Sequence, residues 1–202
     1  AECQGLIVAT KPADVGPAVA AASRAGVERI VSIAAGVSTG SIESAAGRDL
    51  PVVRAMPNTP ALVGAGAAAI AGGRHVSEAD LVWAESVLGA VGTVVRVPEA
   101  SLDAVTGLSG SGPAYVFFFL EAMQQAGSEL GLTPAQAYKL AVATFAGASA
   151  LAAASDDPPQ LLRERVTSKG GTTHAAITSM ENDGVKEMFM RAMKAAPGAP
   201  GR

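Results

Sequence analysis

Short runs of apolar, mostly β-branched residues alternate with helical spacing over the first half of the chain. Such runs are typical of strands that are buried on both faces of a sheet, whereas apolar positions three and four residues apart are typical of helices. Strands are predicted at residues 5–10, 30–33, 51–56, 67–71 and 93–97. Helices are predicted at residues 15–26, around Ile42, and at 77–88, where Ser77 and Asp80 form a capping box. This alternation predicts an α/β fold with a parallel sheet.

The pattern changes at residues 98–103, and only helical spacing follows. Helices are predicted from residue 113 to 130, from the start signal Thr133-Pro134-Ala135-Gln136 to residue 151, and at 160–166, 174–181 and 184–193. The chain is therefore interpreted as two domains, residues 1–98 and residues 99–202. Residues 197–202 are predicted to be disordered.

The predicted helix from residue 134 has a face of small residues, which allows another helix to approach closely: Ala137, Ala141, Thr144 and Ala148. The helical domain is small and rich in apolar faces that its own helices do not cover. A domain of this kind usually completes its core with a second copy of itself, so a homodimer through residues 99–202 is predicted.

Composition narrows the classes of function. The net charge is −3 and no basic run occurs, which argues against a nucleic-acid partner. The single cysteine, Cys3, excludes an internal disulfide and fits a reducing compartment. No tract supplies the ~20 apolar residues of a membrane span, and no signal peptide is recognised, so a cytoplasmic protein is expected. The chain starts at Ala1 and runs directly into a strand, so we expect a segment ahead of it.

Candidate chemistry lies in loops rather than in clusters of reactive side chains. His75 and His174 are far apart in sequence, and no residues have the spacing of metal ligands or of a catalytic triad. Ligands of open α/β sheets bind beyond the carboxyl ends of the strands. Three such ends stand out: residues 9–12, 34–36 and 56–60.

Glycine-rich stretches form the second kind of candidate. Residues 64–69 and 110–115 match the dinucleotide signature only weakly, since the first leads into a strand and the second has Tyr115 at its last small position. The run from Ser168 to Thr173 instead places two glycines before a predicted helix. Helix starts attract carboxylates and phosphates. An ordinary turn with a threonine N-cap stays open as the alternative.

Three motifs together resemble the Δ1-pyrroline-5-carboxylate reductase family: residues 54–60 (RAMPNTP), residues 105–115 (VTGLSGSGPAY), and residues 166–173 (VTSKGGTT). The resemblance covers essentially the whole chain. It implies an N-terminally incomplete, Rossmann-like dinucleotide-binding domain followed by an all-helical dimerisation domain. It also implies that NADPH or NADH reduces a small-molecule substrate, the cyclic imine, to L-proline, the last step of proline synthesis.

The resemblance also implies roles for individual residues. The substrate carboxylate is expected to bind at Ser168, Gly170, Gly171 and Thr172. The catalytic hydroxyl, facing the ring nitrogen, is expected to be that of Thr173. The dinucleotide is expected to lie along Lys11, Pro12, Ala35, Asn58 and Thr59. Family members place the sheet domain of one subunit against the helical domain of the other, so the site is expected to need the dimer; assembly of dimers into a higher oligomer is left open.

Two departures from the family pattern keep alternatives open. The family's glycine-rich loop is expected ahead of Ala1, so a chain that begins there is expected to bind a dinucleotide weakly or not at all. The choice between NADPH and NADH stays open. Lys169 stands where the family usually has proline. One alternative is a related reductase acting on another imine or on a hydroxy acid, with Lys169 or Lys139 as the acid/base. Another is a non-catalytic dimerisation module.

Overall fold

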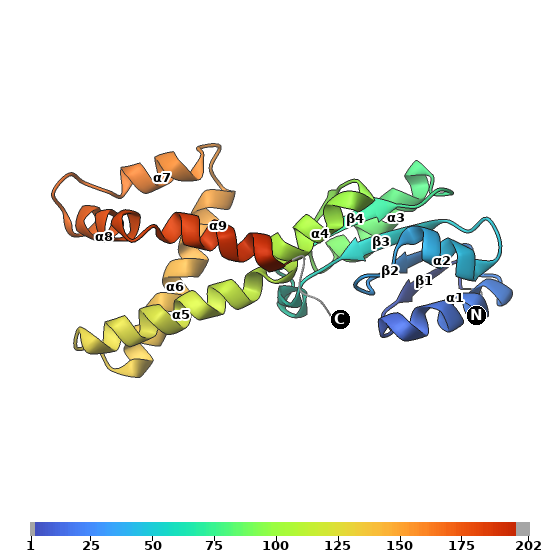
Figure 1. Ribbon diagram of the computed structural model, residues 1–202, viewed down its shortest axis with the longest axis horizontal. Coiled ribbons are helices and arrows are strands. Elements are labelled where there is room, and N and C mark those ends of the chain that lie inside the picture. Colours follow the sequence, from blue (N-terminus) through green and yellow to red (C-terminus); the bar gives the residue numbers. More distant parts are fainter. Residues whose placement is uncertain (1–2, 197–202) are drawn as a thin grey trace. The chain divides into compact units, whose positions relative to one another are not determined.

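The computed structural model describes residues 3–196, so the predicted disorder of residues 197–202 lies outside the described residues. The described chain forms two compact units, one of residues 3–113 with 194–196 and one of residues 114–193. Figure 1 shows the strands confined to the first unit and helices alone in the second. The prediction of an α/β part followed by an all-helical part is confirmed.

The first unit contains a five-stranded sheet with strand order β1-β2-β3-β4-β5. Its strands are β1 (Gly5–Val8), β2 (Arg29–Ser32), β3 (Val52–Met56), β4 (Gly66–Gly72) and β5 (Gly92–Arg96). β1, β2 and β3 are parallel, and β4 and β5 are parallel to each other, but β4 runs antiparallel to β3. The prediction of a wholly parallel sheet is wrong at this one pair. The connection between β3 and β4 holds only the short helix η2 (Thr59–Val63), and a parallel crossover needs about a dozen residues or more.

Helices cover both faces of the sheet. Successive side chains of a strand point to opposite faces, so the neighbours Val52 and Val53 of β3 belong to different hydrophobic clusters. Val52 packs with α1 (Val15–Arg24) and α2 (Thr39–Ala46), whereas Val53 packs with α3 (Glu78–Gly89). The short helix α4 (Leu102–Val105) packs through Leu102 on Ala69 and Ala71, which face the same side as Val52. The predicted capping box of Ser77 and Asp80 is confirmed at the start of α3.

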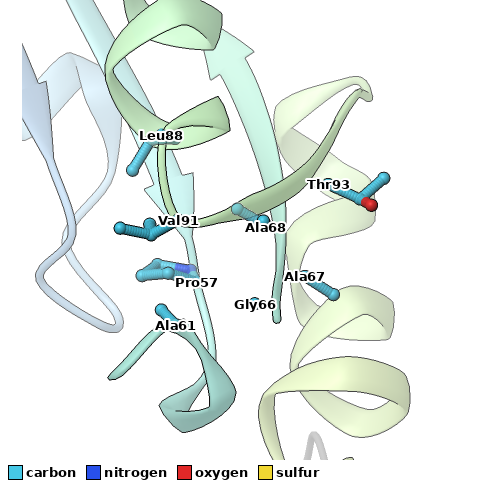
Figure 2. A pocket seen from close by; sticks show the side chains of 9 residues that line it. Pro57, Ala61, Gly66, Ala67, Ala68, Leu88, Val91 and Thr93 are labelled. Atoms are coloured by element: carbon cyan, nitrogen blue, oxygen red, sulfur yellow. The ribbon is translucent and has the colours of Figure 1, made fainter. Parts of the chain in front are cut away.

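The beginnings of β4 and β5 touch at a glycine pair. A Cβ atom on Gly92, whose φ is +157°, would lie 2.0 Å from the carbonyl oxygen of Gly66. Figure 2 shows Gly66 with the side chains of Pro57, Ala61, Leu88 and Val91 around it. These residues enclose an apolar cavity of about 10 Å³, which has room for one water molecule at most. The cavity is therefore a packing feature rather than a ligand site.

The second unit consists of α5 (Gly112–Glu129), α6 (Pro134–Ala153), α7 (Pro159–Arg165), α8 (Thr172–Asn182) and α9 (Val185–Ala195), of which α5 begins and α9 ends in the first unit. The predicted capping box of Thr133 and Gln136 opens α6. Phe189 of α9 lies 5.7 Å, between ring centroids, from both Tyr115 and Phe119 of α5. These aromatic contacts pack α9 against α5.

The second unit buries little of its own apolar surface. Among residues 114–193, only Ala137 and Ala141 are buried. A Cβ atom on Gly127 of α5 would lie 2.9 Å from that of Ala137, so this part of the small-residue face of α6 already packs within the chain. Thr144 and Ala148, farther along the same predicted face, are exposed. The large apolar side chains that remain exposed here include Phe117, Phe118, Leu130, Leu140 and Leu151.

The glycine pair yields a stability prediction. Gly92→Ala should lower the free energy of unfolding by about 1–3 kcal/mol or more, because the added methyl group meets the backbone of Gly66, which cannot rotate away. Gly89→Ala, at the end of α3 with nothing within 4 Å of its Cβ position, is the matched control and should be neutral or stabilising by up to about 1 kcal/mol. Urea denaturation measures both variants, and equal effects of the two would contradict the backbone contact.

Candidate functional site

Three of the predicted ligand-binding loops meet at one edge of the sheet in the first unit. The last residues of β1 and β2 are register partners, Val8 with Ser32, and Ser32 is the partner of Arg54 in β3. The loops that follow these parallel strands therefore emerge side by side, at the edge where α/β folds bind ligands. They carry the predicted dinucleotide residues, of which four are exposed and Asn58 is partly buried: Lys11, Pro12, Ala35, Asn58 and Thr59.

Asn58 has both ends of its side-chain amide engaged within the protein. Its Oδ1 accepts a hydrogen bond of 2.8 Å from the Ala67 N–H, and its Nδ2 donates one of 3.0 Å to the Ser109 carbonyl. The side chain thus joins the exit of β3 to the entry of β4 and to the turn that precedes α5. Asn58 therefore holds three segments together at this edge of the sheet. A residue that only formed a turn between two prolines would not make these hydrogen bonds.

The turn that Asn58 contacts is a single π-helical turn, η4 (Thr106–Gly110). A Cβ atom on Gly110 would lie 2.6 Å from the Met56 methyl group, so the glycine allows the turn to lie against the end of β3. Single π turns inside helices are rare and occur frequently at functional sites. Periodicity did not predict this one, although the run of glycines and serines at residues 107–112 marked the segment.

A carboxylate that sequence reasoning missed lies beside the same strand ends. Glu99 accepts two hydrogen bonds from Thr39, one of 2.7 Å from the backbone N–H and one of 2.6 Å from the hydroxyl. It also forms an ion pair with the largely buried Arg54, whose Nη1 lies 3.3 Å from Oε1 of Glu99. Burial alone would raise the pKa of Glu99, but the hydrogen bonds from Thr39 and the ion pair with Arg54 outweigh it and hold the pKa below its usual range. Its partners lie 60 and 45 residues away in sequence, so no local pattern could have revealed them.

The second unit contains the predicted carboxylate-binding loop. Gly170 has φ = +75°, a backbone conformation that favours glycine, and the Gly171 N–H donates to the Ser168 carbonyl at 3.0 Å. Gly171 is the N-cap of α8, so Thr172 and Thr173 are its first two helical residues. The alternative that threonine caps this helix is wrong, because a glycine without a side chain occupies the capping position.

Both threonines are exposed at the start of α8, as are Ser168 and Gly170. The first N–H groups of a helix have no partner within the helix, and they carry its partial positive charge. Within the part of the chain that the structure describes, the hydroxyls of Ser168 and Thr173 form no hydrogen bond with another residue. This loop therefore presents free donors to a small anion.

The two lysines considered as alternative acids or bases lie in different surroundings. Lys169 is exposed within the glycine loop, one residue from Ser168, whereas Lys139 is exposed on α6. Nε2 of His75 lies 3.4 Å from Oδ1 of Asp49. His174 is exposed on α8. Among residues 3–196, no three histidine, cysteine or acidic side chains are grouped as metal ligands, and no helix there is long and apolar enough to cross a membrane.

Comparison with known proteins points to one family. The family model described as pyrroline-5-carboxylate reductase dimerisation matches residues 99–198. Proteins named pyrroline-5-carboxylate reductase from Pseudomonas aeruginosa and Synechocystis are each 43% identical to this chain; the matches cover 97% and 95% of the chain, and 67% and 72% of those proteins. The relative of that name from Corynebacterium melassecola is 46% identical, and the chain spans 62% of its length.

Solved structures agree with the sequence comparison. The pyrroline-5-carboxylate reductase of Coxiella burnetii is similar with a TM-score of 0.92 at 37% identity, over 96% of this chain and 73% of that one. The Plasmodium falciparum enzyme, solved with NADP bound, has a TM-score of 0.85 at 30% identity, over 96% of this chain and 75% of that one.

The lowered pKa of Glu99 gives a pH prediction. A carboxylate whose pKa is lower in the folded than in the unfolded state stabilises the fold above the unfolded pKa and loses this contribution as the pH falls through the folded pKa. The difference in unfolding free energy between the wild type and Glu99→Gln should therefore be full at pH 7 and shrink below about pH 4. Chemical denaturation at several pH values measures it, and a difference that stays constant from pH 7 down to about pH 3 would speak against this charged interaction.

Proposed function

The chain belongs to the pyrroline-5-carboxylate reductase family, and we propose that it reduces the cyclic imine 1-pyrroline-5-carboxylate to L-proline, the last step of proline biosynthesis, with hydride from NAD(P)H. The observation that carries the proposal is the loop at the start of α8. It combines exposed backbone and hydroxyl donors with an exposed Thr173, within the motif of residues 166–173 that resembles the family. A cyclic imine with one carboxylate needs both features, because one holds the anion and the other serves the ring nitrogen.

The substrate carboxylate binds to the loop of Ser168, Gly170, Gly171 and Thr172 in this proposal. The Gly171 N–H already donates to the Ser168 carbonyl and so holds the turn in shape. The donors left for the carboxylate are the Ser168 hydroxyl and the N–H groups of Gly170 and Thr172. Helix α8 adds its partial positive charge at the same place.

Thr173 acts on the ring nitrogen. Its hydroxyl is exposed in the first turn of α8, immediately after the carboxylate-binding residues. From there it can donate a hydrogen bond to the imine nitrogen, or hold a water molecule that protonates this nitrogen. A positioned proton donor typically contributes about 10²–10⁴-fold to a rate.

The dinucleotide lies along the strand-end loops of the first unit in this proposal, lined by Lys11, Pro12, Ala35, Asn58 and Thr59. The exposed backbone near Gly36, whose φ is +76°, allows close approach of a flat ligand, and Lys11 supplies a cation for its phosphates. When bound, NAD(P)H supplies the hydride. The protein orients both reactants and excludes water from them.

We further propose that the enzyme is a cytoplasmic homodimer, with residues 1–98 as the dinucleotide-binding domain and residues 99–202 for dimerisation and substrate binding. The exposed apolar side chains of α5 and α6 support the dimer, since a monomer would leave them in water. The match of residues 99–198 to a dimerisation model supports it as well. The single free cysteine, Cys3, fits a reducing compartment.

The activity can be tested directly with the protein as its gene encodes it. Oxidation of NADPH or NADH is followed with 1-pyrroline-5-carboxylate, the product is identified as L-proline by chromatography, and simple 2-keto acids serve as comparison substrates. Turnover of the imine with stoichiometric proline supports the proposal. Turnover of a keto acid without proline formation would assign the chain to a reductase with another substrate.

Thr173→Ala separates catalysis from helix stability. If the hydroxyl serves the ring nitrogen, Thr173→Ala should lower kcat about tenfold or more, whereas Thr173→Ser should keep most of it. Because Gly171 and not Thr173 caps α8, neither variant should melt more than a few degrees below the wild type. Steady-state kinetics and thermal melts measure both properties. Wild-type kcat in the alanine variant would remove Thr173 from the mechanism.

A further inference from the structure

We propose that Glu99 is a positioning residue for the dinucleotide side of the site, because it fixes the loop of residues 33–38 between β2 and α2. The inference rests on the function proposed above. It concerns a residue that lies outside the predicted lining loops and reaches them only through its hydrogen bonds. No local sequence signal marks it, so it emerges from the structure alone.

The loop of residues 33–38 is held at its two ends and open in its middle. At the first end, the Ile33 N–H donates to the Val8 carbonyl at 3.0 Å, which ties the loop to β1. At the other end, Thr39 is buried and both of its donors bind the Glu99 carboxylate. Ala35 and Gly36, between these ends, are exposed at the carboxyl edge of the parallel strands. The conformation of the exposed part therefore depends on both anchors.

Glu99 lies on one face of the sheet, between two groups of helices that cover this face. α1 and α2 cover this face over the first strands, and α4 covers it over β4. Arg54 is on β3 between these two layers, pairs in register with Ala71, and is largely buried. Its guanidinium holds Glu99 on the side that faces β3, while Thr39 holds it on the side that faces α2. The carboxylate thus joins three segments that are distant in sequence.

The same contact decides what the start of α2 can bind. Helix starts attract phosphates through their free N–H groups. At α2, the Thr39 N–H is taken by Glu99 and the Ser41 N–H by the Ser38 hydroxyl at 3.2 Å. An internal negative charge also lies there. Two of the first three N–H groups of α2 are thus engaged beside a carboxylate, which disfavours a phosphate there, and the loop before α2 is left to contact uncharged parts of the dinucleotide.

Fluorescence titration of NADPH and NADH, without imine and with the protein as its gene encodes it, tests the proposal. Glu99→Ala should raise the Kd about tenfold at unchanged binding stoichiometry, and Glu99→Gln, which keeps one acceptor, should raise it less. Glu85→Ala is the matched control: it removes another carboxylate paired with an arginine of this unit, Arg96, but lies on α3, which covers the opposite face, and its Kd should equal that of the wild type.

A second measurement does not depend on the cofactor. Amide hydrogen exchange of peptides covering residues 33–42 should be about tenfold faster in Glu99→Ala than in the wild type or Glu85→Ala, since the Thr39 N–H loses its acceptor. A purely structural role would lower the melting temperature and the fraction of protein that binds, at an unchanged Kd. An unchanged Kd of Glu99→Ala would overturn the proposal, whatever the exchange rate, and so would unchanged exchange of residues 33–42.

Thr39→Val covers the case in which Glu99→Ala does not fold. It removes only the hydroxyl that donates to Glu99 and should raise the Kd about threefold; an unchanged Kd would then overturn the proposal. The failure of the proposed function has a different signature. In that case the wild-type protein would bind neither NADPH nor NADH, or would bind one of them without converting the imine to proline.

Discussion

The reversal of strand direction between β3 and β4 is the constraint on which the first unit depends. The connection between these strands is too short for a crossover helix, so β4 must return antiparallel to β3. β5 is parallel to β4, and the chain therefore leaves the sheet on the level of Ile70, whose carbonyl accepts from the Val97 N–H. From that point Glu99 can reach the middle of β3 and the start of α2. Had β4 been parallel, residue 99 would emerge at the other end of the sheet.

The same reversal explains why Asn58 carries two hydrogen bonds in a place where a turn residue would carry none. The Gly66 N–H at the start of β4 donates to the Val91 carbonyl, whereas the N–H of the next residue, Ala67, and the Ser109 carbonyl of the π turn both face the Asn58 side chain. One planar amide with an acceptor at one end and a donor at the other satisfies both. One side chain thus ties the end of β3, the start of β4 and the π turn together at this edge of the sheet.

The sequence predicted those features that depend on neighbouring residues. The strands, the two capping boxes and the change to helices after residue 98 follow from periodicity and local start signals. The π turn at residues 106–110 and the Glu99 contacts did not follow, because they depend on backbone closeness or on partners tens of residues away. The direction of β4 is a different case: the connection between β3 and β4 is too short for a parallel crossover, and this length is visible in the sequence, but the alternation of strands and helices alone predicts a parallel sheet. For the candidate site, the glycine loop before α8 was visible locally. The N-cap at Gly171 was assigned only from the backbone geometry, since glycine and threonine are both acceptable there.

The thin packing of the second unit has a consequence for how the protein folds at different concentrations. The helices of the second unit bury only Ala137 and Ala141 within one chain, so in the proposed dimer most of their apolar burial would come from association. Mass action would then govern the stability of this unit, so that dilution would favour unfolding and the melting temperature would rise with the protein concentration. Assembly and folding would then form one equilibrium. In a cell, the folded fraction would increase with the rate of synthesis, and a chain made in small amounts would be exposed longest to proteases.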